Sequence, residues 1–221
     1  MLAALLDLAC PRRCPGCGER GHLLCPPCAA TLRGTPFVAD PSPRPAGLPP
    51  VVAASAYDGP ARAALIAYKE RGRVALAGPL GAALAGAVAV LGADVLIAVP
   101  SSAAARRSRG FDHVTLLARA AAARTGARVV GGLRQQRRVR DQSGLDAAAR
   151  ASNIAGSMAF KGRAGQLAGA RILVVDDIVT SGATLTEAVR ALSAAGICTS
   201  GVAVVAATRR WAPLHKPIAP G

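Results

Sequence analysis

The chain has 221 residues, which is enough for one full domain with a small appendage but short for two ordinary domains. Hydrophobic residues make up 52% of the sequence, which excludes an intrinsically disordered protein. The formal net charge of +15, from 27 basic and 12 acidic residues, favours anionic partners, either nucleic acid or phosphorylated small molecules. A general preference for arginine in the composition would produce the same charge without any such partner.

Two apolar stretches raise the question of a membrane. The first, Met1 to Ala9, contains Asp7 and lacks a basic leader, so it predicts a short packing helix rather than a secretory signal. The second, Val74 to Ala93, carries no charge over about 20 residues, the length of a membrane span. Because it consists mostly of Ala and Gly and is followed by a strand-like run, a buried helix is the better interpretation. We therefore expect a cytoplasmic protein with no membrane insertion.

Five of the six cysteines lie in residues 1–35, here called the cysteine module. Four of them form two C-x2-C pairs, a spacing typical of structural zinc, because each pair places two thiolates at one turn. A segment this small cannot bury a core of its own, and disulfides are disfavoured in the cytoplasm. Cys10 and His22 are conceivable further ligands, but the symmetry of the two pairs disfavours both, and a structural role or none is expected for each. Cys198 is expected as a buried residue of a core strand. The predicted zinc ligands are Cys14, Cys17, Cys25 and Cys28.

A proline-rich run, residues 36–50, predicts an extended, semi-rigid linker, because proline cannot donate ladder hydrogen bonds. From residue 51 to residue 212, short aliphatic runs alternate with helical patterns, and residues 213–221 predict a loose tail. The alternation indicates an α/β domain, with a parallel sheet flanked by helices on both faces. The expected strands are 51–56, 95–99, 128–130, 172–175 and 202–206, and the expected helices are 60–71, 80–91, 114–125 and 185–195.

The stretch from Ile172 to Thr184 carries the strongest functional signal. A predicted buried strand runs directly into Asp176 and Asp177, and three hydroxyl side chains then surround Gly182 before a predicted helix. Ligands bind at the carboxyl edge of open parallel sheets, and a helix N-terminus suits a phosphate group. The two carboxylates would repel phosphate but accept hydrogen bonds from vicinal sugar hydroxyls, so the stretch predicts a site for a phosphorylated ribose. An ordinary capped turn would explain only one of the two aspartates.

These thirteen residues resemble, at every position, the phosphoribosyl pyrophosphate (PRPP) binding signature of type I phosphoribosyltransferases. The resemblance implies that Asp176 and Asp177 bind the ribose hydroxyls and act in catalysis. Family members use Mg2+ bound to PRPP, and their parallel sheet is flanked by helices with a variable hood over the acceptor site. The residues implied to hold the 5-phosphate are Thr180, Ser181, Gly182, Ala183 and Thr184.

The wider pattern is similar to that of the ComF family, whose named examples are linked to DNA uptake in natural transformation. The resemblance covers nearly the whole chain and implies a pyrophosphate-binding loop at Pro100 and Ser101, with Lys69 and Arg109 as candidate basic groups. Surface charge is an equally good interpretation of these two basic residues. The motifs that carry the resemblance, in chain order, are the four-cysteine module, 68–72, 99–100, 109–113, 142–145, 150–153 and the PRPP signature.

Two positions depart from the ComF pattern. Ser101 and Ser102 stand where Pro-Leu is usual, and Asp112 and His113 stand where Asn-Gln is expected. A His beside an Asp could be a general base, but a capping or solvent-exposed role at the start of a helix is the favoured interpretation.

Two functional hypotheses follow. The first is an enzyme that transfers phosphoribosyl from PRPP to an unidentified acceptor and releases pyrophosphate. The second is a non-catalytic accessory protein of DNA uptake (competence), which binds single-stranded DNA or a helicase partner through its basic surface. The densest basic run, Arg134 to Asp141, could track a nucleic-acid backbone, close over PRPP, or be a plain solvated loop. A second copy of the chain, forming a homodimer, is a further candidate partner.

Overall fold

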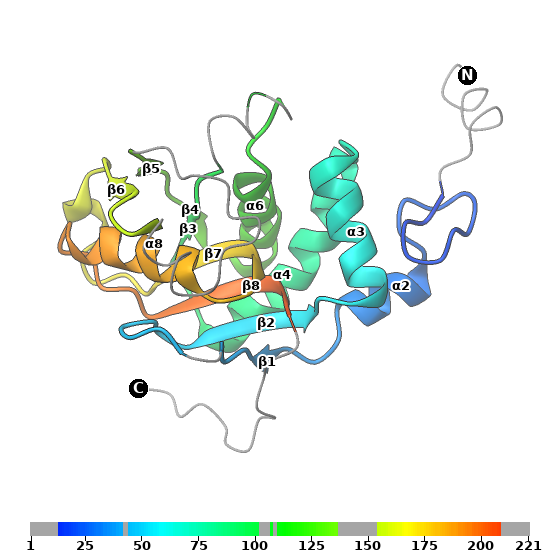
Figure 1. The fold of residues 1–221 in the computed structure, drawn as a ribbon, viewed down its shortest axis with the longest axis horizontal. Coiled ribbons are helices and arrows are strands. Elements are labelled where there is room, and N and C mark those ends of the chain that lie inside the picture. The colour runs from blue at the N-terminus through cyan, green and yellow to red at the C-terminus, as the bar shows by residue number, and fades with distance from the viewer. Residues whose placement is uncertain (1–12, 42–43, 102–106, 108–109, 137–153, 209–221) are drawn as a thin grey trace.

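The computed structural model describes residues 13–41, 44–101, 107, 110–136 and 154–208, and six of its strands form one central sheet (Figure 1). Five neighbouring strands run parallel, whereas β1 pairs antiparallel with β2 at one edge. The predicted parallel sheet is therefore confirmed, with an antiparallel edge strand inside the proline-rich run that we expected to be a linker. In spatial order the strands are β1 (Phe37–Val38), β2 (Val51–Ala56), β8 (Gly201–Ala207), β7 (Ile172–Val179), β3 (Val95–Ala98) and β4 (Arg128–Val129).

Helices cover both faces of this sheet, as the near-continuous aliphatic strands require. Alternate strand residues point to opposite faces, so that Leu173 and Val205 join one apolar cluster while Val174 and Val204 join the other. The first cluster is shared with α2 (Pro26–Leu32), α3 (Gly59–Glu70), the 3-10 helix η1 (Val74–Leu76), α4 (Ala77–Leu91) and α6 (His113–Thr125). The second is shared with α8 (Ala183–Ser193) and the 3-10 helix η2 (Ala164–Leu167).

The apolar stretch that raised the question of a membrane forms η1 and α4. Within the described parts of the chain, Val74–Leu91 is the one helical stretch that could cross a membrane by length and composition. Its residues Leu80, Leu84 and Val88 are buried in the cluster that α4 shares with α6 and with strands β2 and β8. This packing is that of a core helix, as predicted.

Strand β7 is longer than predicted, and this changes the setting of the acidic pair. It continues to Val179, so Asp176 and Asp177 lie within the strand rather than in a loop after it. The ladder with β8 runs to the pairing of Val179 with Ala207, whereas the ladder with β3 ends where Ala98 meets Val175. The acidic pair therefore lies where β7 has lost one of its two neighbours, which opens space beside the strand. The ends of the other predicted elements shift by one to three residues where they shift at all.

A two-stranded hairpin, formed by β5 (Leu133–Gln135) and β6 (Met158–Phe160), was not predicted, because three-residue strands give no readable alternation. It is fastened to α8 by the buried Glu187, whose carboxylate accepts a hydrogen bond from the Met158 amide at 2.8 Å. Arg190 pairs with the same carboxylate at 2.7 Å and also donates to the Met158 carbonyl at 3.0 Å. Most of the basic run that begins at Arg134, including Arg137, Arg138 and Arg140, lies outside the described residues.

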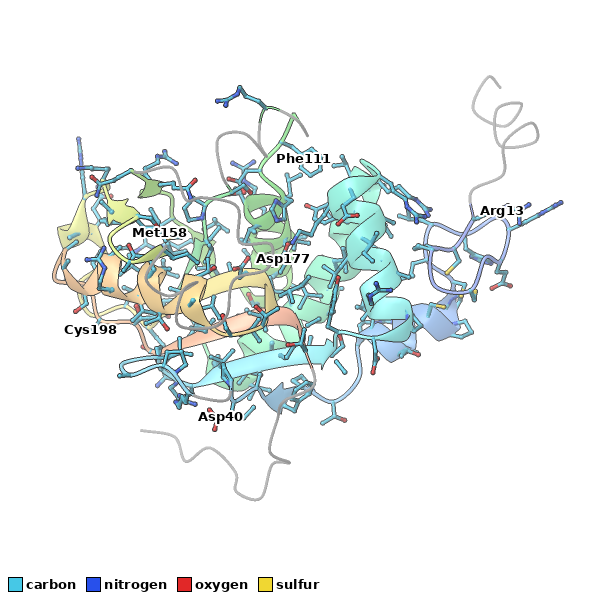
Figure 2. All side chains as sticks on the ribbon, viewed as in Figure 1. Arg13, Asp40, Phe111, Met158, Asp177 and Cys198 are labelled. Atoms are coloured by element: carbon cyan, nitrogen blue, oxygen red, sulfur yellow. The ribbon has the colours of Figure 1, made fainter. Side chains whose placement is uncertain are left out.

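Cys198 is exposed, so the prediction of a buried core residue is wrong. Strand β8 begins only at Gly201, and Cys198 belongs to the connection that leads into it. Its neighbour Ile197 takes the core position instead. Figure 2 shows Cys198 at the opposite end of the molecule from Arg13, where the described part of the cysteine module begins.

Candidate functional site

The cysteine module brings its two C-x2-C pairs together. The Sγ atoms of its four cysteines all lie within 4.8 Å of one another. The first pair sits on a turn in which the Gly18 amide donates to the Cys14 carbonyl at 2.9 Å, and the second pair opens α2. Tetrahedral zinc holds its sulfur ligands at about 2.3 Å, which requires the sulfurs to be near 4 Å apart. The four residues therefore have the chemistry and the spacing to hold a zinc ion, namely Cys14, Cys17, Cys25 and Cys28.

The thiols of this cluster differ in acidity. Burial raises the pKa of Cys14, but backbone amides led by that of Cys25 outweigh burial and lower it to about 6. Burial, together with the neighbouring thiols, raises the pKa of Cys28. Gly16 lies against the same sulfur, because a Cβ added there would meet the Cys28 Sγ at 2.7 Å. Four sulfurs packed this closely cannot all ionise unless a cation compensates them, which fits a structural metal.

A second set of side chains lines a cavity of about 350 Å³ at the carboxyl ends of β3 and β7. Helix α3 contributes Lys69 from its last turn, α6 contributes its first two residues, and the chain leaving β3 also lines the cavity. In Figure 2 the labelled Asp177 lies near the middle of the molecule, between α6 and α3. The polar residues around the cavity are Tyr57, Lys69, Ser101, His113, Asp176, Asp177, Thr180 and Thr184.

Asp177 is the centre of the charges in this cavity. It is 4% exposed, and its Oδ2 lies 2.8 Å from the Lys69 Nζ and 2.8 Å from the His113 Nε2. Burial raises the pKa of the Asp177 carboxyl, but the hydrogen bond from His113 and the charge of Lys69 outweigh it and lower the pKa to about 2. Asp177 is therefore a carboxylate with two partners of its own before any ligand arrives.

Asp176 has the opposite character. Burial and the charge of Asp177 raise the pKa of its carboxyl well above the ordinary range. Its Oδ1 accepts a hydrogen bond from the Asp177 amide at 2.8 Å, which compensates only part of that effect. Two adjacent carboxyls with pKa values driven apart form a site that can take up positive or hydroxyl-bearing groups in exchange for a proton.

His113 is buried, 6% exposed, and does not lie on the solvent-exposed surface that we favoured for it. The cap of α6 is Asp112, whose Oδ1 accepts from the Thr115 amide at 3.2 Å. The ring of His113 instead joins Ser101 to the acidic pair, with its Nδ1 2.9 Å from the Ser101 Oγ. Its backbone carbonyl accepts a hydrogen bond from the Tyr68 hydroxyl at 2.8 Å, and burial with the nearby carboxylates raises the pKa of that tyrosine.

The loop between β7 and α8 forms a smaller cavity of about 30 Å³, lined by residues 178–185. Gly182 precedes α8 with φ of +78°, a left-handed conformation that favours glycine. A Cβ at Gly182 would meet the side chains of Leu48, Pro41 and Pro45 at 3.2 to 3.4 Å. The proline-rich run therefore packs directly against this loop, a contact that the sequence pattern did not predict.

The predicted site residues fall into three groups by position. Those from the strand ends and α3 share the large cavity, namely Asp176, Asp177, Thr180, Thr184, Pro100, Ser101 and Lys69. Those of the loop line the small cavity, namely Ser181, Gly182 and Ala183, together with the two threonines. Arg109 lies outside the described residues. Sequence reasoning did not single out Tyr57, and no motif surrounds it that could have done so.

One comparison with known proteins shows the family of this chain. The family described as "Phosphoribosyl transferase domain" matches residues 94–216, more than half of the chain. Among solved structures, orotate phosphoribosyltransferase from Aeropyrum pernix is similar at 15% sequence identity and a TM-score of 0.34, over 82% of this chain and 93% of that one. No curated protein gives a significant match. The family match includes β3, β7, the acidic pair and the loop, whereas Lys69 and the cysteine module precede it.

Proposed function

The chain belongs to the phosphoribosyl transferase domain family, and from that premise we propose that it is a ComF-like protein that transfers phosphoribosyl from PRPP to an acceptor. The single observation that carries the proposal is the cavity in which an acidic pair, a basic residue and a hydroxyl-rich loop meet at one sheet edge. Asp176 and Asp177 would accept hydrogen bonds from the ribose hydroxyls. The loop from Thr180 to Thr184 would bind the 5-phosphate, since its backbone amides open a helix.

The remaining polar groups fit the leaving pyrophosphate. Lys69 and Ser101 line the cavity on the side of α3 and the end of β3, and Lys69 could turn from Asp177 to an anionic ligand. Mg2+ would enter bound to PRPP and neutralise part of the pyrophosphate charge. In the transfer, an acceptor atom bonds to the anomeric carbon while the bond to pyrophosphate breaks. The carboxylate of Asp177 would stabilise the positive charge that develops on the ribose ring.

Calorimetric titration with PRPP and Mg2+ tests this proposal. Replacing both carboxyls, as Asp176→Asn/Asp177→Asn, should weaken binding at least about a hundredfold, because the hydrogen-bond acceptors of both carboxyl groups and the charge of Asp177 are lost. Asp94→Asn is the matched control, since Asp94 lies at the amino end of β3, at the opposite edge of the sheet, where it accepts from the Arg171 amide. Equal affinity of the native and doubly substituted proteins would overturn the assignment of the ribose site. Pyrophosphate release across a panel of bases and amines then tests turnover.

A role in DNA uptake is the second candidate, and the net charge of +15 is the observation that favours it. Under this alternative the chain binds single-stranded DNA or a helicase, and PRPP is a ligand without turnover. A salt-dependent shift with oligonucleotides that disappears on replacing Arg137, Arg138 and Arg140 with Ala would support it. Tight PRPP binding without DNA affinity at physiological salt would remove it.

A further inference from the structure

Three buried side chains that line the large cavity, Ser101, His113 and Asp177, contact one another in sequence. The Ser101 Oγ lies 2.9 Å from the His113 Nδ1, and the His113 Nε2 lies 2.8 Å from the Asp177 Oδ2. All three residues are less than a tenth exposed. They belong to the chain leaving β3, to the first residue of α6 and to β7, so the contacts join segments that are distant in sequence. The histidine departs from the residue expected at this position of the ComF pattern.

The number of available protons restricts how these contacts can be made. A carboxylate only accepts hydrogen bonds, so the contact with Asp177 requires a proton on the His113 Nε2. The Nδ1 then accepts the Ser101 hydroxyl proton when the imidazole is neutral, and donates to the Ser101 oxygen when the imidazole is charged. Ser101 has one proton, and the Asp112 Oδ1 lies within 3.4 Å of its oxygen as a second acceptor. The protonation of His113 therefore decides where the Ser101 hydroxyl points.

We propose that His113 is a positioning residue that turns the Ser101 hydroxyl towards bound PRPP, and this inference rests on the proposed function. When the imidazole holds protons on both nitrogens, Ser101 accepts from it and donates its own proton to an anionic oxygen of the ligand. As PRPP binds, a proton from solvent forms an N–H bond at the Nδ1, and no bond between heavy atoms changes in this step. The same imidazole donates a hydrogen bond from its Nε2 to Asp177. One side chain therefore orients both Ser101, on the pyrophosphate side of the site, and Asp177, on the ribose side.

Several charged and polar groups surround the ring of His113. Among the described residues, the groups that face it are Asp177 on β7, Lys69 and Tyr68 on α3, and Asp112 beside it on α6. Asp176, adjacent to Asp177, adds no opposing positive charge. A polyanionic ligand beside Lys69 and Ser101 would add negative charge near the imidazole and would so favour its charged form over its neutral form.

The test measures protons as well as affinity. Mg2+ and PRPP are titrated into the full chain at pH 7.5 in two buffers of different ionisation enthalpy, which gives the number of protons taken up per ligand. The native protein should take up more protons than His113→Gln, and the substitution should weaken binding about tenfold. His22→Gln, which removes a histidine of the cysteine module, is the matched control and should leave both values unchanged. Thermal melts confirm that each variant is folded, and His113→Asn serves if the Gln variant is not.

A double-substitution cycle separates a relay from two independent contacts. If Ser101 acts through His113, Ser101→Ala should weaken binding by a similar factor, and the double variant should bind no more weakly than either single one. Independent, multiplying losses would overturn the inference, as would equal proton uptake by the native and His113→Gln proteins. Either result leaves the proposed function standing. A folded native protein that does not bind PRPP at all would instead overturn the proposed function, and the inference with it.

Discussion

The cysteine module and the acidic cavity both bring ionisable groups of the same kind close together, but they differ in what compensates the negative charge. In the module, four thiols lie within 4.8 Å of one another, and backbone amides, led by that of Cys25, lower the pKa of Cys14. In the cavity, Asp177 already has Lys69 and His113 within 2.8 Å. We therefore expect the module to depend on a metal ion for its fold and the cavity to be formed before its ligand binds.

Metal removal should give the largest effect. A strong chelator should release about one zinc ion per chain and unfold the module, because structural zinc contributes on the order of 10 kcal/mol to such small units. The α/β domain should still melt cooperatively, since its clusters lie on both faces of the sheet. Metal analysis and hydrogen exchange measure the two outcomes.

Two cysteine variants control this experiment. Cys25→Ser should lose the metal, whereas Cys198→Ser should keep it, because Cys198 is exposed in the connection before β8. Protein that is purified under reducing conditions with zinc present and still contains no metal would contradict the zinc assignment.

Asp177→Asn should cause the next largest effect, a loss of about 3 kcal/mol in the free energy of unfolding at pH 7, because it leaves the half-buried Lys69 ammonium and the buried His113 Nε2 without the carboxylate that both contact. The pKa of Asp177 is lower in the folded protein than in the unfolded chain, so its stabilisation is present above about pH 4. It is lost as the pH falls towards 2. Urea unfolding at pH 7 and pH 3 should therefore show a smaller difference between native and variant at pH 3. A pH-independent difference would show that the ion pairs are not the cause.

Asp176→Asn should act in the opposite direction and stabilise the ligand-free protein. Because the folded protein raises the pKa of Asp176, the unfolded chain gains by ionising it once the pH exceeds about 4. The native protein is thus penalised as the pH rises above about 4, and the variant is not. We expect a gain of about 2 kcal/mol at pH 7, measured by urea unfolding, together with weaker PRPP binding. A variant less stable than the native protein at pH 7 would contradict this account of the pair.

The same comparison explains what the sequence could predict. The four cysteines of the module are separated by fourteen positions or fewer along the chain, and local turns bring them together, so their spacing alone predicted that they meet. The acidic pair and the loop could also be predicted, because they are continuous in sequence with one aliphatic run. Lys69, Ser101 and His113 reach the cavity from three other segments, and only the path of the chain in space shows that they meet Asp177. The length of β7 was predicted wrongly for a related reason. Two adjacent carboxylates suggested a loop, but pairing with β8 continues the strand past both of them.

Gly182→Ala should give the smallest effect, and it tests whether the proline-rich run supports the phosphate loop. The left-handed conformation alone should cost about 1 kcal/mol in the free energy of unfolding. Gly126→Ala is the matched control, because Gly126 has nearly the same φ, +77°, but a Cβ there would meet nothing within 4 Å. At Gly182 the added carbon would press on Leu48, Pro41 and Pro45, so the Gly182 variant should be the less stable of the two by roughly a further 0.5 to 1 kcal/mol. It should also bind inorganic phosphate or PRPP more weakly, whereas the Gly126 variant should bind as the native protein does. Equal losses of stability and equal affinities would mean that the proline-rich run touches the loop without supporting it.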